Sequence, residues 1–323
     1  MLQRFNDFLQ KRMAFVTPTC MIVGILFSDY TRYGIPYVSY VFAVMTFIGA
    51  LKSSFKDVKN VFRHPLPLIT VFVLLHVVLP SAAWGAGHLF FSSNPNLITG
   101  MVLEFSVPAA VVGLMWVSIY NGNNTLALAL VVVDTVLAPF VIPTTLRILV
   151  GANVQMDTTG MMKDLIFMIA IPALLAMSLN QISGGKVKET WPQKLAPWSK
   201  ICMIFVVTSN SSKVAPYVKH MTFQRVCTAL TILALAATAY ALGWGVALLM
   251  KQKQENVISM AFGSGLRNIS AGAVIAAQYF PGEVLFPVMI ATLFQQMLAA
   301  CYGKLIVKSY IKNRYCSQVT SKQ

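Results

Sequence analysis

The sequence predicts an all-α integral membrane protein with ten transmembrane helices arranged as two inverted repeats of five. Hydrophobic residues make up 57% of the chain and charged residues only 11%, whereas soluble domains carry about 25% charged residues. The mean hydropathy of +0.68 agrees with this class. A transmembrane helix needs about 20 predominantly apolar residues. Ten stretches approach that requirement, with rough extents of 12–29, 35–52, 66–86, 97–120, 123–149, 160–182, 197–212, 223–250, 254–280 and 284–307.

The two halves of the chain carry similar irregularities. Residues 15–21 resemble residues 169–175, and each segment has a proline about one turn into its span. Ser106-Val107-Pro108-Ala109-Ala110 interrupts the fourth span, and Gly263-Ser264-Gly265 interrupts the ninth. Five spans per half is an odd number, so the halves would have opposite orientations. Matched broken helices in inverted repeats are typical of secondary transporters, although proline and glycine are common in transmembrane helices in general.

The organisation is that of one membrane domain. Polar stretches are too short for a separate soluble domain, so we expect a single domain over residues 1–323. Repeat one would cover about residues 1–155 and repeat two about residues 156–323. The amphipathic first residues lead directly into the first span, without the pattern of a cleavable signal peptide.

Basic residues orient the chain. The net charge of +15 reflects Lys and Arg in short loops, as the positive-inside rule predicts, and does not indicate nucleic-acid binding. We expect a multi-pass cell-membrane protein with both termini in the cytoplasm. Lys213, Lys219 and Arg225 fall on the predicted outside and do not fit this pattern. The residues that define the cytoplasmic face are Lys11, Arg12, Lys52, Lys56, Lys59, Arg63, Lys186, Lys188, Lys194, Lys200, Lys304, Lys308, Lys312 and Arg314.

Arg267 is the most informative single residue. It follows the glycines of the ninth span, and a cation at bilayer depth costs roughly 2.5–3.5 kcal/mol on insertion scales. The N-terminal end of a half-helix offers unpaired N–H groups and a positive dipole. The planar guanidinium adds a fixed charge that suits a carboxylate or a sulfonate. Arg267 is therefore predicted to hold an anion or to replace a bound cation, or else to form a structural ion pair.

Other ionisable side chains within the spans are candidate coupling groups. Asp134 in the fifth span must be paired, protonated or facing water, and a partnership with Arg267 is favoured over proton coupling. Glu104 lies four residues before Pro108, so it would face the break and line the cavity or pair with Arg267. His76 is a packing histidine or a coupling group. Further candidates for the lining of a cavity are Pro108, Ser106, Ser264, Asn268, Ser270, Gln295 and Gln296.

The sequence lacks the common motifs for metal binding, disulfide frameworks and catalysis. Five scattered cysteines without a C-x-x-C pair support neither a metal site nor a disulfide framework. Phosphate loops, zinc patterns and nucleophile elbows do not occur, so no cofactor, no metal and no enzymatic activity are expected. An intramembrane enzyme with Asp134 and Glu104 as an acid pair is one rival, but no known catalytic spacing supports it.

The chain resembles the bile acid:sodium symporter family, which also includes bacterial carriers of other organic anions. The resemblance rests on Pro108 with the polar turn after the fourth span, on Leu137-Ala138-Pro139, and on Gly265-Leu266-Arg267-Asn268. The last segment is similar to a Glu-x-Gly-x-Gln-Asn signature. The resemblance implies ten helices in two inverted repeats, with spans four and nine discontinuous and crossing. It also implies alternating access between a core domain and a panel domain.

The departures from the family pattern concern the sodium sites. Counted without gaps, the sodium-binding glutamate and glutamine of the family fall at Gly263 and Arg267 of this sequence. The other polar family positions fall on apolar residues. Sodium needs several oxygen ligands, so the two sodium sites are not carried over. The positions that lose a polar side chain are Leu75, Gly113, Leu114, Ala127 and Val131.

These observations favour a secondary active transporter of small or amphipathic organic anions, and transport without sodium is one reading of its coupling. An ordinary sodium-coupled symporter with relocated ligands is one alternative, and proton coupling through Asp134 or Glu104 is another. A membrane sensor or scaffold without transport activity is a third reading. It does not explain why polar, broken helices lie in the membrane. The sequence does not name the substrate.

Overall fold

The chain is described by a computed structural model that covers residues 13–55, 65–151 and 157–320, with side chains from residue 15 to residue 310 inside those ranges. Helices and short connections make up this described part, and it contains no β-strand beyond one isolated bridge. Lys11, Arg12, Lys56, Lys59 and Arg63, which helped to orient the chain, lie outside the described residues.

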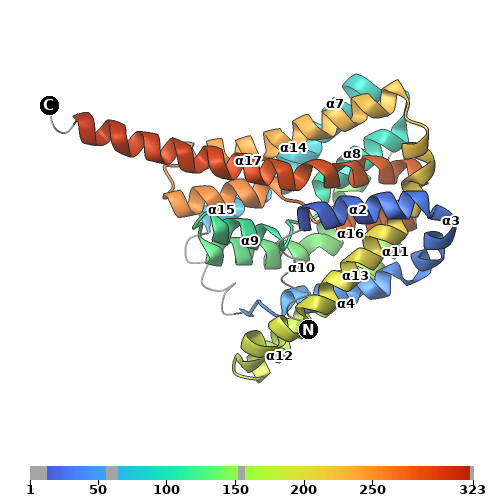
Figure 1. Cartoon of the computed structure of the whole chain (residues 1–323), viewed down its shortest axis with the longest axis horizontal. Helices are drawn as coiled ribbons and strands as arrows, with labels where there is room; N and C mark the ends of the chain where they lie inside the picture. Colours follow the sequence, from blue (N-terminus) through green and yellow to red (C-terminus); the bar gives the residue numbers. More distant parts are fainter. Residues whose placement is uncertain (1–12, 56–64, 152–156, 321–323) are drawn as a thin grey trace.

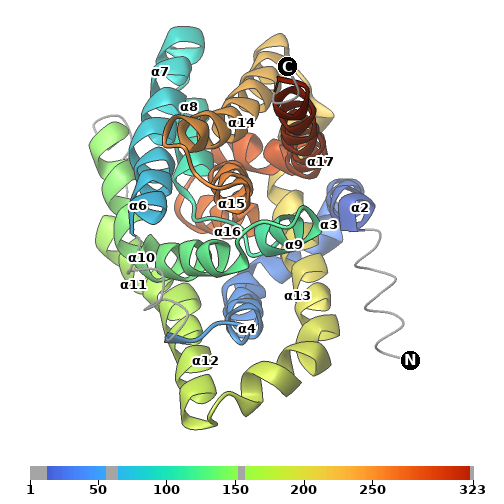
Figure 2. The same ribbon diagram turned by 90° about the vertical axis from the view of Figure 1, so that its left-hand side faces the viewer.

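One group of helices, which we call the panel helices, consists of α2, α4, α12 and α13. Helix α13 packs along both α2 and α4, and α12 packs against α4. Figure 2 shows α4, α12 and α13 together in its lower half. The bounds of these helices are Met13–Leu26 for α2, Val38–Ala50 for α4, Ile171–Ile182 for α12 and Lys186–Lys219 for α13. The connecting elements are α3 (Ser28–Thr31), η1 (Arg32–Tyr37), α11 (Thr158–Leu165) and η3 (Ile166–Ala170).

The remaining elements form a second group, the core helices. Helix α8 packs between α7 and α17, while α14 packs on α15 and α17. The long α17, drawn in red, runs across this group in Figure 1, with α7 above it and α15, α9 and α16 below it. The bounds are Leu66–Val73 for α6, Leu74–Val78 for η2, Leu79–Phe91 for α7, Pro95–Ser106 for α8, Gly113–Ile119 for α9, Asn124–Leu149 for α10, Phe223–Leu249 for α14, Gln254–Gly265 for α15, Ile269–Tyr279 for α16 and Gly282–Thr320 for α17.

The helices are long and apolar enough for a multi-pass membrane protein. Within the described residues, six continuous helices can cross a bilayer by length and composition, and two shorter apolar helices accompany them. The six helices cover Ser28–Ala50, Leu66–Phe91, Asn124–Leu149, Thr158–Ile182, Phe223–Leu249 and Gly282–Tyr310.

The other four expected spans differ in form. The first becomes the short α2, and the seventh, expected at 197–212, becomes the much longer α13 with three internal prolines. The fourth and ninth are each split into two short helices, as the sequence predicts. The ninth helix, however, continues through Gly263 and Gly265 and breaks only at Leu266. The count of ten spans in two inverted repeats therefore stays a prediction at this point.

Close packing explains why those glycines remain helical. A Cβ atom on Gly265 would lie 2.4 Å from the ring of Tyr240, and one on Gly243 would lie 2.7 Å from the carbonyl oxygen of Met260. Helices α14 and α15 can approach this closely only where a side chain is missing. The glycines thus serve the contact between two helices, and the break has another origin.

Candidate functional site: a buried guanidinium where two broken helices cross

Two interrupted helices cross at the centre of the core helices. Helix α8 ends at Ser106 and α9 begins at Gly113, while α15 ends at Gly265 and α16 begins at Ile269. The extended segments between them pair as a single antiparallel bridge between Ala109 and Arg267. The backbone N–H of Ala110 donates to the carbonyl oxygen of Leu266 at 3.0 Å, and the N–H of Asn268 donates to that of Pro108 at 2.7 Å. Each extended segment therefore supplies hydrogen-bond partners for the backbone of the other.

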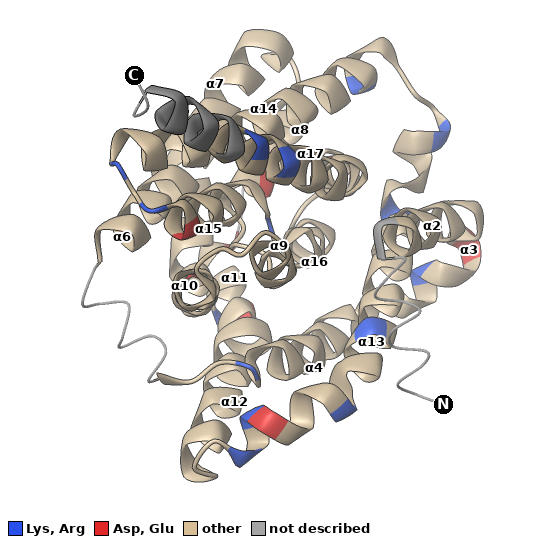
Figure 3. Ribbon diagram, turned by 60° about the vertical axis from the view of Figure 1, so that its left-hand side comes forward, with Lys and Arg blue, Asp and Glu red and all other residues tan. Residues whose placement is uncertain are grey.

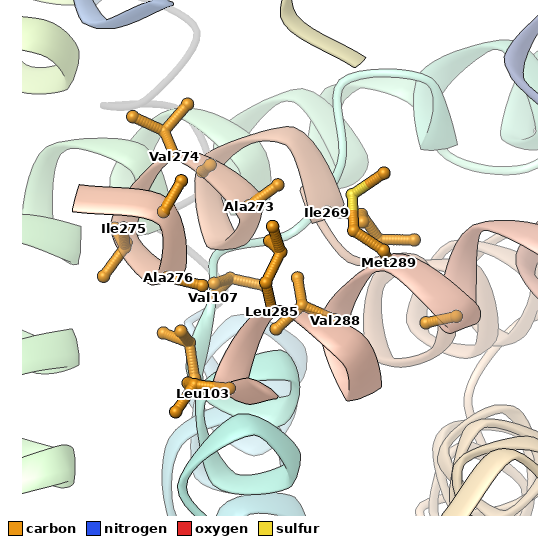
Figure 4. Close-up of a cluster of buried hydrophobic side chains, with 14 of the residues drawn as sticks. Leu103, Val107, Ile269, Ala273, Val274, Ile275, Ala276, Leu285, Val288 and Met289 are labelled. Atoms are coloured by element: carbon orange, nitrogen blue, oxygen red, sulfur yellow. The ribbon is translucent and has the colours of Figure 1, made fainter. Parts of the chain in front are cut away.

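Local chemistry fixes the first break. Pro108 has no N–H to donate to a helix, and the residue before a proline is pushed toward extended backbone. Val107 accordingly has a ψ of 153° and ends α8. The side chain of Val107 packs among Leu103, Leu285 and Val288 (Figure 4), so the break is anchored in the hydrophobic core.

Arg267 lies in the second extended segment and is 3% exposed. Its Nη1 donates to the carbonyl oxygen of Val107 at 3.2 Å, and its Cζ lies 6.0 Å from the centre of the Phe105 ring. The Nε and Nη2 atoms are buried and have no hydrogen-bond partner within the described chain. Buried donors are rarely left unpaired in folded proteins, so these two nitrogens mark a candidate site for a ligand.

Asn268 joins the guanidinium to the start of α16. It caps this helix because its Oδ1 accepts the N–H of Ala271 at 3.2 Å. The side chain of Gln295 on α17 donates to the carbonyl oxygen of Arg267 at 2.5 Å, which holds the segment from the other side. The positive end of the α16 dipole and the Arg267 charge therefore lie next to one another.

Asp134 pairs with groups other than the guanidinium. Its Oδ2 accepts the N–H of Ala109 at 2.7 Å, and its Oδ1 lies 2.8 Å from Nε2 of His76. The expected ion pair of Asp134 with Arg267 does not form: in the described part of the chain, no carboxylate lies within 4.0 Å of this guanidinium. The physical reason is that the break exposes the Ala109 N–H, and a charge-assisted bond to it satisfies the carboxylate.

Glu104 is buried in the same region. It is 2% exposed, and its Oε2 has no hydrogen-bond partner among the described residues. It lies close enough to Arg267 for electrostatic attraction. Glu104 thus lies near Arg267 without a direct hydrogen bond to it, and the Nε and Nη2 donors of the guanidinium stay unpaired within the described chain.

A cavity of about 290 Å³ lies between the panel helices and the core helices. Arg267 and Asn268 are both part of its lining, together with the neighbouring Ala110 and Ser270. Most other lining side chains are apolar and come from both groups of helices, as with Phe42 of α4, Val131 of α10 and Val206 of α13. Lys200 of α13 is a second basic residue in the lining. The cavity thus combines the Arg267 wall with mainly apolar surroundings.

The predicted site residues divide into two sets. Besides Arg267 and Asn268, the cavity is lined by the predicted Ser270, Gln295 and Gln296. The rest lie outside the lining: Ser106 donates back to Val102, and Ser264 is buried without a partner for its hydroxyl in the described chain. The remaining candidates outside the lining are Glu104, Pro108, Asp134 and His76.

Sequence reasoning missed Asn210 on α13. It is fully buried, lines the cavity, and has no partner for either side-chain polar atom within the described residues. The available signal was the polar run Thr208-Ser209-Asn210-Ser211-Ser212 inside an otherwise apolar span. It is the panel-side counterpart of the polar groups on the core side.

The positions of the family's sodium ligands hold no acidic side chain. A Cβ atom on Gly263 would already lie 3.0 Å from Leu130, and Leu75 and Ala127 are buried among other apolar residues. Across the described residues, no group of three or more His, Cys, Asp or Glu side chains could hold a metal ion.

Comparison with known proteins identifies relatives. YbaS of Bacillus subtilis (strain 168), named as an uncharacterized protein, is 41% identical over 300 residues, which cover 93% of this chain and 98% of that protein. YocS of the same organism, named as an uncharacterized sodium-dependent transporter, is 18% identical over 293 residues, or 89% of each chain. The sequence model of the sodium bile acid symporter family matches residues 17–221, more than half of the chain. The family resemblance is thereby confirmed, and the chain belongs to the sodium bile acid symporter family.

Proposed function

We propose that the protein is a secondary active transporter of small organic anions that works by alternating access between the panel helices and the core helices. The observation that carries the proposal is Arg267, a buried guanidinium with two unpaired donors in the wall of a cavity between the two groups. A buried charge of this kind in a transmembrane region usually marks a substrate or ion pathway. Family members are transporters rather than enzymes, which agrees with this role.

The chemistry of the cavity defines the substrate class. Two adjacent guanidinium N–H groups match a planar carboxylate or a sulfonate in a bidentate geometry. The neighbouring start of α16 adds a positive dipole. The other walls are mainly apolar, so the anion needs a short hydrocarbon part. A volume of about 290 Å³ is near the lower end of ligand pockets, which favours a small compound.

Sodium is not needed in this arrangement. Arg267 supplies a permanent positive charge where the family places a sodium-binding glutamine, and Gly263 supplies no carboxylate. A fixed cation can attract the anion without a bound metal ion. Sodium-coupled transport with relocated ligands is the second candidate, because the relative YocS is named as a sodium-dependent transporter.

The membrane arrangement belongs to the same proposal. Ten spans in two inverted repeats are supported by the reciprocal bonds at the crossing, since Pro108 pairs with Asn268 as Leu266 pairs with Ala110. In this arrangement Lys52, Lys186 and Lys251 lie on the face that carries both termini, which would be cytoplasmic. Figure 3 shows much of the Lys and Arg colour at helix ends and connections.

Ligand binding in detergent tests the anion site. Purified protein is heated with pyruvate, 4-methyl-2-oxopentanoate, benzoate or ethanesulfonate, and the melting temperature is recorded. At least one of these anions should stabilise the wild type and should fail to stabilise Arg267→Ala. Arg225→Ala is the matched control, because Arg225 is an exposed guanidinium that bonds to the backbone of His220, and it should respond like the wild type. Equal stabilisation of Arg267→Ala, or of no variant at all, contradicts the proposal.

Transport in proteoliposomes separates a carrier from a sensor or scaffold. The stabilising anion, in radiolabelled form, should enter vesicles that contain the wild type and should not enter vesicles with Arg267→Ala. Uptake should be the same in sodium and in potassium media. Strict dependence on sodium would favour the second candidate, and binding without uptake would favour a sensor.

A further inference from the structure

His76 and Asp134 form a buried pair behind the cavity wall. Their side chains are 10% and 0% exposed, and Nε2 of His76 lies 2.8 Å from Oδ1 of Asp134. The other carboxylate oxygen accepts the Ala109 N–H, so Asp134 is satisfied as an anion. A neutral imidazole that donates from Nε2 leaves its Nδ1 as an acceptor. This Nδ1 is buried and has no partner within the described chain.

The backbone around His76 is irregular. Residues Leu74–Val78 form a π-helical turn, η2, between α6 and α7. Such turns are rare and often occur at functional sites. Here the turn places the imidazole against Asp134 of α10, and its neighbour Leu75 packs in the apolar cluster of the crossing.

Two further ionisable side chains share this buried centre with the pair: Glu104 on α8 and Arg267 at the crossing. Arg267 is attracted electrostatically by Asp134 and by Glu104. With a neutral His76, the Arg267 cation and the Asp134 carboxylate offset one another in formal charge. Of the other titratable or charged groups on elements packed against the pair, Tyr240 on α14 is fully buried. The rest lie toward helix ends: His88 on α7, Arg147 on α10, Lys163 and Asp164 on α11, Arg225 and Cys227 on α14, and Glu255 on α15.

We propose that the His76–Asp134 pair binds a coupled proton, so that one proton moves with each negative charge of the organic anion. This inference rests on the proposed transport function. A bound monoanion would add a negative charge to this buried centre, which is costly in a medium of low dielectric constant. A proton taken from water by Nδ1 of His76 gives an imidazolium with N–H groups on both nitrogens and restores the original charge. No other bond forms or breaks.

The pair is connected to the anion site through the backbone. Asp134 holds the N–H of Ala109, Ala109 is bridged to Arg267, and the next residue, Ala110, lines the cavity. A second N–H on His76 changes the charge next to this carboxylate and thus the strength of its bond to the break. Because Nδ1 is buried in this state, proton exchange needs a change in local packing.

The first test needs no anion. The full chain in lipid nanodiscs is labelled with ¹⁵N at its four histidines, and the His76 signals are assigned by their loss in His76→Gln. The His76 ring should change between neutral and doubly protonated forms as the pH is lowered from 8 to 5, the interval in which histidine acts as a switch. A single protonation state over this interval would overturn the proposal, whether or not anions bind.

The second test counts protons. The heat of binding of the strongest stabilising anion from the four-compound panel is measured in phosphate and in Tris buffer, which differ in ionisation enthalpy. The wild type should take up about one proton per monoanion. His76→Gln should bind the anion with little proton uptake, because glutamine keeps an N–H donor for Asp134 but cannot hold a proton.

His88→Gln is the matched control, since His88 is partly exposed on α7, where its ring contacts the backbone and the indole of Trp84. It should take up a proton as the wild type does. Binding without proton uptake in the wild type refutes proton coupling and leaves the anion carrier intact. The absence of binding by all four anions contradicts the carrier itself. The histidine titration then tests proton binding by the His76–Asp134 pair independently.

Discussion

At the scale of single residues, the proposed transport function depends on donors that the fold leaves unpaired. Arg267 uses one guanidinium nitrogen to hold the Val107 carbonyl and leaves two nitrogens for a ligand. Asn210 across the cavity has both of its polar side-chain atoms free of partners in the described chain. The burial of such groups costs about 1–3 kcal/mol each unless something bonds to them. A ligand that forms hydrogen bonds with these groups would therefore recover the free energy that their burial costs.

The shape of the cation matters as well as its charge. Arg267→Lys keeps a positive charge but loses the planar fork that suits a carboxylate. We expect the affinity for the stabilising anion to fall by roughly 10-fold, since the loss of one charge-assisted hydrogen bond is worth about 1.5–3 kcal/mol, partly offset by the retained charge. Titration calorimetry measures the change. An unchanged affinity would show that the guanidinium acts only as a point charge.

At the scale of elements, the two helix breaks arise differently. The first follows from Pro108 and is readable in the sequence. The second break does not lie at the glycines where the sequence predicted it. Gly265 remains helical and allows Tyr240 to pack closely against α15. Asn268 then starts α16 by capping its first turn. The first break could be predicted because local chemistry sets it. The second break was misplaced by three residues because packing against a neighbouring helix sets it.

The cap of α16 allows stability and binding to be separated. Asn268→Ala should lower the free energy of unfolding by about 1 kcal/mol because an N-cap is lost. Asn268→Asp should keep the cap but weaken anion binding, since it adds a negative charge beside Arg267. Melting temperatures and anion titrations of the two variants give the comparison. If both variants bind the anion as the wild type does, Asn268 is only a structural cap.

Two glycines on α14 provide a matched pair for the helix contact. A Cβ on Gly243 would meet the Met260 carbonyl at 2.7 Å, whereas nothing lies within 4 Å of one on Gly245. Gly243→Ala should destabilise the protein by about 1–3 kcal/mol through overpacking. Gly245→Ala should be neutral or stabilising by up to about 1 kcal/mol, because glycine disfavours a helix interior. Thermal melts in detergent measure both, and equal effects would rule out the close contact of α14 with α15.

At the scale of the whole molecule, the panel and core helices touch around the end of α16. Gln278 of α16 donates to the hydroxyl of Ser39 at 2.5 Å, and Lys213 of α13 donates to the carbonyl oxygen of Ala277. The cavity lining extends the other way, to Ser53 beyond α4 and to Lys200 in the first half of α13. These contacts therefore close the cavity at one end only.

Loss of the closing contacts should shift the population toward the opposite opening. In a cysteine-free background, a cysteine that replaces Thr46 in the cavity wall reports on access. Gln278→Ala combined with Lys213→Met should raise its labelling by an impermeant thiol reagent at least several-fold from the α16 side. Gln181→Ala, at an exposed position on α12, should not. Unchanged labelling would indicate that these bonds do not hold the closed state.

The sequence by itself determined the membrane class, the family and the break at Pro108, because apolar composition and proline chemistry act on each residue locally. It also singled out Arg267, since a cation inside an apolar span is costly wherever the helices lie. Only the tertiary structure decided that Asp134 bonds to His76 and to the Ala109 N–H, that Asn210 faces the cavity, and that Glu104 lies behind it. These outcomes depend on which helices cross and at what depth, and the residues involved are from 25 to more than 100 positions apart in the chain.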